Sequence, residues 1–178
     1  MLDGEQAIIA RAVRGESSAF GLLYDHYEPQ IYRFVFIKVS RREEAEDLTH
    51  QIFLSAWQSI GRYEDLGFPF SSWLYRIARN EVIDYYRSKR EFVPIEDLDP
   101  ELLAIPSDAA RIVDQSLALE RALAVIQELK PEHQDVLIMR FIDDMPIKDV
   151  ALAMGKTEGA VKLLQHRALR QVERRLRP

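Results

Sequence analysis

The sequence contains no cysteine, which excludes disulfide bonds and thiolate-ligated metal centres. It also contains no run of about 18 apolar residues, so we expect no segment that spans a membrane. The first residues, Met1 to Glu5, lack the basic and apolar stretches of a secretion signal. Together these absences predict a cytoplasmic protein that does not insert into a membrane.

Residue patterns typical of enzymes are missing as well. Only seven glycines occur in 178 residues, and none belongs to a phosphate-cradling loop. The four histidines are scattered along the chain. Glu46 and His50 stand four residues apart and could in principle hold a metal, but such a pair on a helix is more simply a surface ion pair. We therefore predict no enzymatic activity, no cofactor and no metal.

Charge is distributed unevenly along this acidic chain, whose formal net charge is −5. Residues 91–115 contain seven acids and one arginine, whereas residues 156–178 contain seven bases and two acids. A free DNA-binding protein normally carries a broad positive field. Any contact with DNA must therefore come from a local arrangement of charge, and the clearest basic excess lies at the end of the chain.

The hydrophobic spacing predicts helices throughout, and the fold class we expect is all-α. Expected features of the first half are a stop at Gly15, a break or new first turn at Pro29, and a capping box that begins at Ser40. A loop should follow Tyr63, and Ser71 or Ser72 should cap a helix that ends near Arg90. Further helices are expected at residues 111–129, 131–142, 146–154 and 157–176. We predict two small helical domains, 1–91 and 113–178, joined by a flexible acidic linker at 92–112.

A helix-turn-helix is the most informative local pattern. Residues 146–154 predict a short helix, Gly155 a turn, and Thr157 the cap of a longer basic helix. At 100° per residue, Val161, Leu164, Ala168 and Val172 form a buried stripe on that helix. The opposite arc is available to DNA and contains Gly159, Lys162, Leu163, His166, Arg167 and Arg170. Arg174, Arg175 and Arg177 only complement the helix dipole.

Three ordered motifs resemble those of bacterial RNA polymerase sigma factors of the small, two-domain extracytoplasmic-function group. They are AEDLTHQIFLSAW at 45–57, FSSWLYRIARN at 70–80, and the helix-turn-helix with its EGAVK and HRA strings. The resemblance runs from about Phe20 to Leu176 and leaves out only the linker. It implies a protein that binds core polymerase and recognises a promoter in two parts. It also implies an anti-sigma partner, and a linker that threads the RNA exit path of the polymerase.

The resemblance also implies which residues act. A helix that contains Asp47 would dock on the clamp coiled coil of the largest polymerase subunit, with contacts from Asp47, Leu48, Gln51 and Phe53. The −10 element would be read and melted by Tyr63, Phe68, Phe70, Trp73, Arg76, Arg79, Asn80 and Arg87. The −35 element would be read by Thr157, Glu158, Gly159, Lys162, Leu163, His166, Arg167 and Arg170.

Several residues allow a second interpretation. Trp73 could be buried rather than stacked on a base, Asn80 could be a buried structural amide, and Leu163 could be merely exposed. The sequence also departs from the family at His50-Gln51, where Gln-Glu is commoner, and at Leu164-Gln165, where Arg-Leu is commoner. The first departure removes one charge from the polymerase contact, and the second removes one phosphate contact.

Two other classes of function fit parts of the sequence. A dimeric helix-turn-helix repressor would leave the aromatic and basic helix at 72–90 unexplained. A purely protein-binding adaptor would leave the basic terminal helix unexplained.

Overall fold

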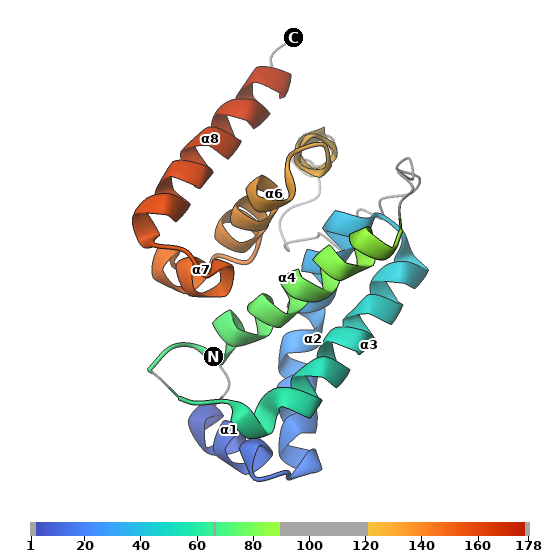
Figure 1. Ribbon diagram of the computed structural model, residues 1–178, viewed down its shortest axis with the longest axis vertical. Coiled ribbons are helices and arrows are strands. Elements are labelled where there is room, and N and C mark those ends of the chain that lie inside the picture. The colour runs from blue at the N-terminus through green and yellow to red at the C-terminus, as the bar shows by residue number, and fades with distance from the viewer. Residues whose placement is uncertain (1–2, 66, 90–120, 177–178) are drawn as a thin grey trace, which may run out of the picture.

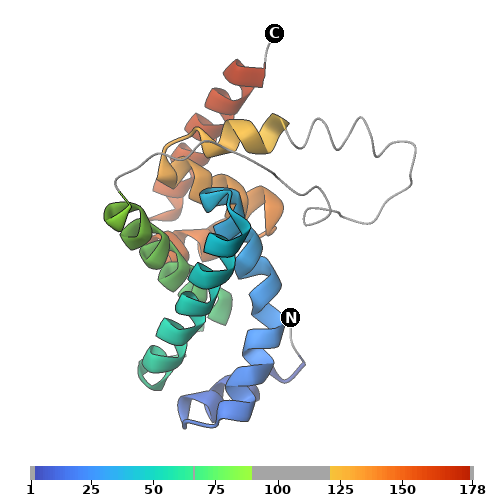
Figure 2. The same cartoon turned by 90° about the vertical axis from the view of Figure 1, so that its right-hand side faces the viewer.

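A computed structural model describes residues 3–65, 67–89 and 121–176, and every regular element in these ranges is a helix. The first group comprises α1 (Glu5–Val13), α2 (Ser17–Val39), α3 (Arg42–Ser59), the 3-10 turn η1 (Ile60–Arg62) and α4 (Phe70–Ser88). The second comprises a helical segment at 121–127, α6 (Pro131–Leu137), the π-helix η3 (Ile138–Ile142), α7 (Ile147–Met154) and α8 (Glu158–Leu176). Figures 1 and 2 show the two groups side by side. The all-α prediction is confirmed, and the predicted linker at 92–112 lies outside the described residues.

The predicted break at Pro29 is wrong, because Pro29 lies inside the continuous helix α2. A proline in a helix interior costs about 3 kcal/mol through a lost hydrogen bond and a steric clash. Tyr27 and Ile31 on either side are buried in the core, with exposed fractions of 5% and 0%. The packing of this face therefore outweighs the local cost, while Pro29 itself points to the exposed side.

Two predicted helix starts are also wrong. Ser40 ends α2 in the left-handed conformation, with φ at 61°, and its amide donates to the carbonyl of Phe36. It therefore cannot cap α3, which follows the extended residue Arg41 without a side-chain cap. Likewise α4 begins at Phe70, directly after Pro69, so neither Ser71 nor Ser72 is its cap.

The helix-turn-helix forms as predicted. Gly155 ends α7 with φ at +62°, a conformation that favours glycine, and the amide of Lys156 donates to the carbonyl of Ala151 at 2.9 Å. The hydroxyl of Thr157 accepts a hydrogen bond from the amide of Ala160 at 3.2 Å, which caps the start of α8. Val161 and Ala168 are fully buried, and Leu164 and Val172 pack against the core. The predicted buried stripe is confirmed.

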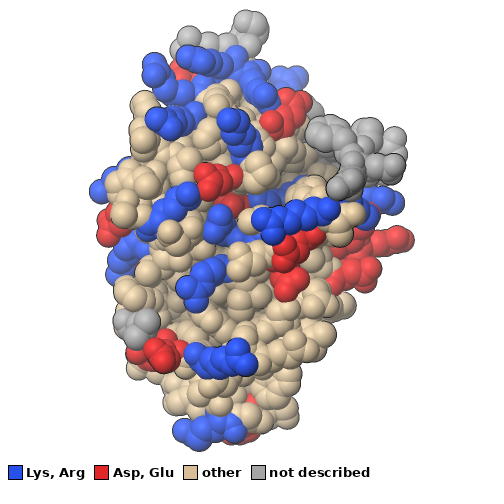
Figure 3. Space-filling model, viewed as in Figure 1, with Lys and Arg blue, Asp and Glu red and all other residues tan. Residues whose placement is uncertain are grey.

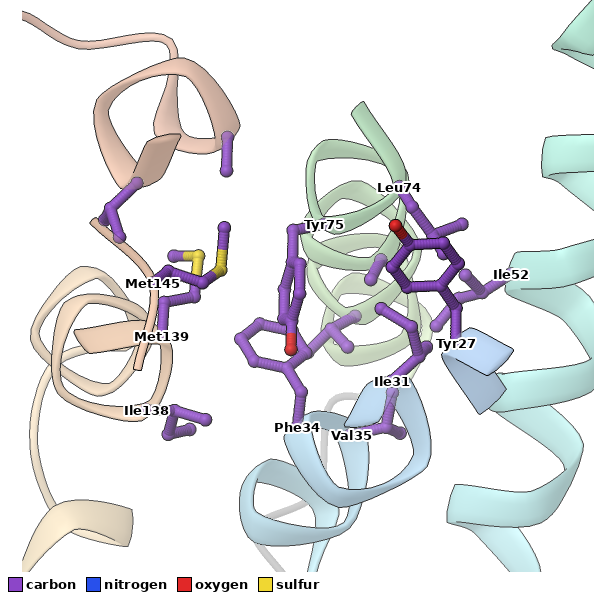
Figure 4. Packing of buried hydrophobic residues seen from close by; sticks show 14 of the residues in the cluster. Tyr27, Ile31, Phe34, Val35, Ile52, Leu74, Tyr75, Ile138, Met139 and Met145 are labelled. Carbon is purple, nitrogen blue, oxygen red and sulfur yellow. The ribbon is translucent and has the colours of Figure 1, made fainter. Parts of the chain in front are cut away.

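The two helical groups share one hydrophobic core, because α4 packs against α7. Phe34 and Tyr75 pack edge to face with ring centres 5.3 Å apart. Figure 4 shows these two rings on the side of the first group that faces Met139 and Met145 of the second. All four side chains are buried, so each group covers apolar surface of the other.

Candidate nucleic-acid interface

The exposed face of α8 carries the side chains that the helical spacing predicted. Lys162, His166, Arg167 and Arg170 are all exposed, and Leu163 is 48% exposed beside them. Figure 3 shows lysine and arginine side chains gathered over the upper part of the molecule, where α8 lies in Figure 1. The departing residue Gln165 accepts a hydrogen bond from Arg140 Nε at 3.4 Å, so its half-buried amide has a partner.

The first turn of α8 leaves space for an approaching molecule. Thr157, Glu158 and Gly159 are exposed. A Cβ added at Gly159 would meet nothing within 4 Å, so in this structure no protein contact requires glycine there. The N-terminal turns of a recognition helix are those that reach base edges in a major groove, while flanking cations contact phosphates. The geometry of α8 suits this mode of binding.

An aromatic cluster lies where the loop after η1 joins α4. The rings of Tyr63, Phe70 and Trp73 pack together, with centres 5.1–5.4 Å apart. Phe70 is only 2% exposed and is a core residue, so the structure contradicts its predicted role as a base-stacking platform. Tyr63 and Trp73 are half-buried, and Phe68 is 47% exposed. Phe68 is thus the ring best placed to meet an unstacked base.

A small cavity of about 140 Å³ adjoins this cluster. Phe68, Trp73 and Arg76 line it from the first helical group, and Leu152 of α7 lines it from the second. Ser72 also lines it, and its buried hydroxyl has no hydrogen-bond partner within the described residues. The cavity therefore offers stacking surface, an unpaired hydroxyl and a cation in one place.

The predicted polar residues of α4 divide into two environments. Arg76, Asn80 and Arg87 are exposed, and the alternative of a buried structural amide at Asn80 is excluded. Arg87 forms an exposed ion pair with Asp84 at 3.2 Å. Arg79 lies on the covered side, with 9% of its surface exposed. The structure therefore does not place Arg79 with the other three on the face that DNA could reach.

Only half of the predicted polymerase contacts lie at the surface of α3. Asp47 and Gln51 are exposed, four residues apart on one face. Leu48 is 7% exposed and Phe53 is 4% exposed, and the Phe53 ring packs on Tyr24 at 4.6 Å. Both are core residues, which contradicts their prediction as contacts to a partner. Sequence reasoning missed Leu54, which is 48% exposed and lies one turn beyond Gln51 on the same face.

Ion pairs occur on the surface of α3. Glu46 pairs with Arg42 at 2.9 Å, and not with His50 as expected. Across residues 3–65, 67–89 and 121–176, no three metal-ligating side chains gather. In the same ranges no helix has the length and apolar composition needed to cross a membrane.

Comparison with known proteins accounts for the two helical groups. Residues 23–92 match the family Sigma-70 region 2, and residues 125–174 match Sigma-70 region 4. The chain is 39% identical over 173 residues to the ECF RNA polymerase sigma factor BldN of Streptomyces coelicolor. The chain belongs to the extracytoplasmic-function group of the sigma-70 family. The match covers 95% of this sigma factor and 64% of the length of BldN.

Solved structures show the same fold. One is CnrH in complex with the cytosolic domain of CnrY. Its TM-score is 0.72 at 20% identity, and the match covers 95% of this sigma factor and 94% of that chain. Another is the sigma factor RpoE from Bartonella quintana in complex with the anti-sigma factor NepR. Its TM-score is 0.71 at 20% identity, and the match covers 88% of this sigma factor and 96% of that chain.

In this sigma factor, region 2 and region 4 are joined by ion pairs, of which those to Asp135 are buried. The carboxylate of Asp135, on α6, contacts Arg79 Nε at 2.8 Å through one oxygen and Lys38 Nζ through the other. Asp143, just after η3, pairs with Arg33 of α2 at 2.5 Å. Burial, and then the nearby charge of Asp143, raise the pKa of the Tyr75 hydroxyl well above its usual value. Both acids come from region 4 and all three cations come from region 2.

Proposed function

We propose that this sigma factor binds core RNA polymerase and directs it to promoters that have a −35 and a −10 element. One observation carries the proposal. Regions 2 and 4 of the sigma-70 family occur in one chain, and each presents an exposed face with chemistry suited to DNA. Its site of action is the cytoplasm, where bacterial polymerase and chromosome meet. Its role is to select and open promoters, and RNA synthesis belongs to the polymerase.

The −35 element is read by α8 in the major groove. Lys162, Leu163, His166 and Arg167 contact base edges, with Leu163 suited to a thymine methyl group. Thr157, Glu158 and Gly159 approach the DNA at the start of the helix, and Arg170 contacts the backbone. The support for this assignment is the continuous exposed arc opposite the stripe of Val161 and Ala168.

The −10 element is melted and held by region 2. An unstacked base stacks on the exposed aromatic surface of Phe68 and is held by the cation of Arg76. Asn80 and Arg87, farther along α4, contact the neighbouring strand. Stacking of one base on an aromatic side chain contributes about 1–3 kcal/mol, which offsets part of the cost of opening the duplex.

Core polymerase contacts α3 through Asp47, Gln51 and Leu54. The clamp coiled coil of the largest subunit can present arginine to Asp47 and an apolar side chain to Leu54. His50 and Gln51 carry less negative charge than the commoner Gln-Glu pair, so Asp47 supplies the main acceptor charge of this surface. An anti-sigma protein holds the factor inactive. This part of the proposal is supported by two proteins of the same fold, CnrH and RpoE, whose structures were solved with CnrY and with the anti-sigma factor NepR bound.

A binding assay with and without core polymerase tests the proposal. Holoenzyme would be reconstituted from the purified chain and core polymerase of the same bacterium, and genomic fragments that it retains would be sequenced. A retained fragment is then used in gel shifts. We expect a sequence-specific shift only when both proteins are present. A shift by the chain alone would indicate a free repressor, and no shift in any mixture would indicate a protein-binding adaptor.

A further inference from the structure

The two oxygens of the Asp135 carboxylate are each bound by a different cation of region 2. Lys38 comes from α2 and Arg79 from α4, 97 and 56 residues away in sequence. The side chains are almost covered, with exposed fractions of 3% for Lys38 and Asp135 and 10% for Arg79. Region 4 thus inserts an anion between two buried cations of the DNA-binding region.

The arrangement is one that a phosphodiester could replace. A DNA phosphate also presents two anionic oxygens on one atom, and lysine and arginine are the side chains that bind it most often. Two cations around one carboxylate leave an excess of positive charge in region 2. Arg79 also donates from Nη1 to the carbonyl of Ala153 at 3.1 Å, near the negative end of the α7 dipole.

The site continues the exposed DNA-binding face of α4. Arg79 lies directly before Asn80 and one turn after Arg76, both exposed. The same helix α7 that covers Arg79 also places Leu152 against the cavity lined by Phe68 and Trp73. In this arrangement region 4 therefore covers part of the surface that our proposed function assigns to the −10 element.

Resting on that proposed function, we infer that Lys38 and Arg79 form a backbone-phosphate site of region 2 and that Asp135 occupies it while the two regions are packed together. The second ion pair, Arg33 with Asp143, also joins region 2 to region 4 in this closed arrangement. Promoter DNA and Asp135 compete for the same two cations. Separation of the regions exchanges a carboxylate for a phosphate, so the cations remain paired in both states.

Neutralising Asp135 tests this inference, and Asp144 provides a matched control. Asp135→Asn removes the charge between Lys38 and Arg79. Asp144→Asn removes the same charge from an exposed residue nine positions away, where φ is 48° and asparagine is well tolerated.

Because the chain has no cysteine, Gln58→Cys on α3 and Arg174→Cys on α8 can each carry one dye. Energy transfer between the dyes then reports separation of the regions.

The DNA probe is a fluorescent oligothymidylate strand, which reports backbone binding without sequence recognition. Apparent affinity rises in proportion to the fraction of open chain, so we expect Asp135→Asn to lower energy transfer and to bind the strand roughly tenfold more tightly. Asp144→Asn should match the unmodified chain in both readings. Adding Lys38→Met to Asp135→Asn should abolish the gain and reduce the salt dependence by about one phosphate contact.

Two results would overturn the inference. In the first, Asp135→Asn lowers energy transfer, so the regions separate, but the chain binds the oligothymidylate strand no more tightly. In the second, Asp135→Asn leaves energy transfer unchanged, so the regions stay packed together. If this variant does not fold, Asp143→Asn opens the regions from the Arg33 side and leaves the phosphate site intact, and the same two results apply to it. Polymerase-dependent promoter binding by the unmodified chain is measured separately, so failure of this inference and failure of the proposed function are distinguishable.

Discussion

Phe68 and Phe70 are separated by one proline and lie in opposite environments. Phe68 is 47% exposed beside the cavity, whereas Phe70 is 2% exposed and packs against Tyr27, Tyr63 and Trp73. The buried ring anchors the first turn of α4, and this anchor fixes the loop that carries the exposed ring. One phenylalanine supports the candidate DNA-binding loop and the other is free to contact DNA.

Alanine at these two positions should have different effects. Phe70→Ala leaves a cavity in the core and should lower the free energy of unfolding by about 3–5 kcal/mol. Phe68→Ala should change stability by less than about 0.5 kcal/mol, because the ring is exposed. It should slow promoter opening while leaving polymerase binding intact. Denaturant unfolding measures the change in stability, and the fluorescence of a base analogue in the −10 element measures promoter opening. Unchanged opening by Phe68→Ala would show that this loop does not hold the melted strand.

The two glycines of the helix-turn-helix give a second paired test. Gly155→Ala forces alanine into the left-handed conformation and should cost about 1–2 kcal/mol of stability. Gly159→Ala lies in open space within α8 and should stabilise the helix by up to about 1 kcal/mol. If DNA approaches closely at Gly159, the same substitution should weaken −35 binding by the holoenzyme. For Gly159→Ala, thermal unfolding should then show a more stable protein, and gel shifts should show a holoenzyme that binds the −35 element less tightly. Binding equal to that of the unmodified holoenzyme would show that DNA does not approach closely at Gly159.

Residues on the exposed arc of α8 should affect sequence recognition in different ways. His166→Ala and Arg167→Ala should each cost the holoenzyme about 1–3 kcal/mol of promoter affinity and relax the preference at individual −35 positions. Arg174→Ala, near the end of the same helix, should have little effect on that preference. Competition with promoters that carry single −35 substitutions measures the preference. The same loss of discrimination for all three variants would point to general charge rather than base contacts.

Stability at high pH should depend on Tyr86. Burial, followed by the charges of Tyr85 and Glu44, raises the pKa of this hydroxyl from 10.0 to about 12, and the hydroxyl donates a hydrogen bond to the Lys38 carbonyl. The folded state thus favours the neutral phenol. Its stabilising contribution is complete below the ordinary pKa and is lost as pH rises through about 12. Tyrosinate absorbance, followed as the pH is raised, should show one high-pH transition fewer in Tyr86→Phe than in the unmodified chain. An unchanged titration would contradict the raised pKa of the Tyr86 hydroxyl.

Sequence reasoning succeeded where local periodicity decides the structure. Val161 and Ala168 are buried and Lys162 and Arg167 exposed because α8 has one apolar stripe with period 3.6. Leu48 shows the limit of transferring a role by resemblance. The resemblance assigned it to polymerase contact, whereas the structure buries it in the core of the first helical group.

The remaining errors come from tertiary contacts that no local pattern contains. Pro29 stays helical because its neighbours are buried, and Ser40 ends a helix because the chain must turn between α2 and α3. Lys38 gave no signal in the sequence, since its role depends on Asp135, 97 residues away. Arg79 fits the family motif but is covered by α7, and only the packing of region 4 on region 2 reveals this.

Transcription in a purified system shows whether this chain directs core polymerase to its promoters. Core polymerase, this chain and a template with one of the genomic promoters retained by the holoenzyme would be combined, and the RNA made from its start site measured. We expect specific transcripts only when both proteins are present, and we expect their loss when either the −35 or the −10 element is replaced. Transcripts that start equally well without the chain, or that survive replacement of both elements, would contradict the proposed function.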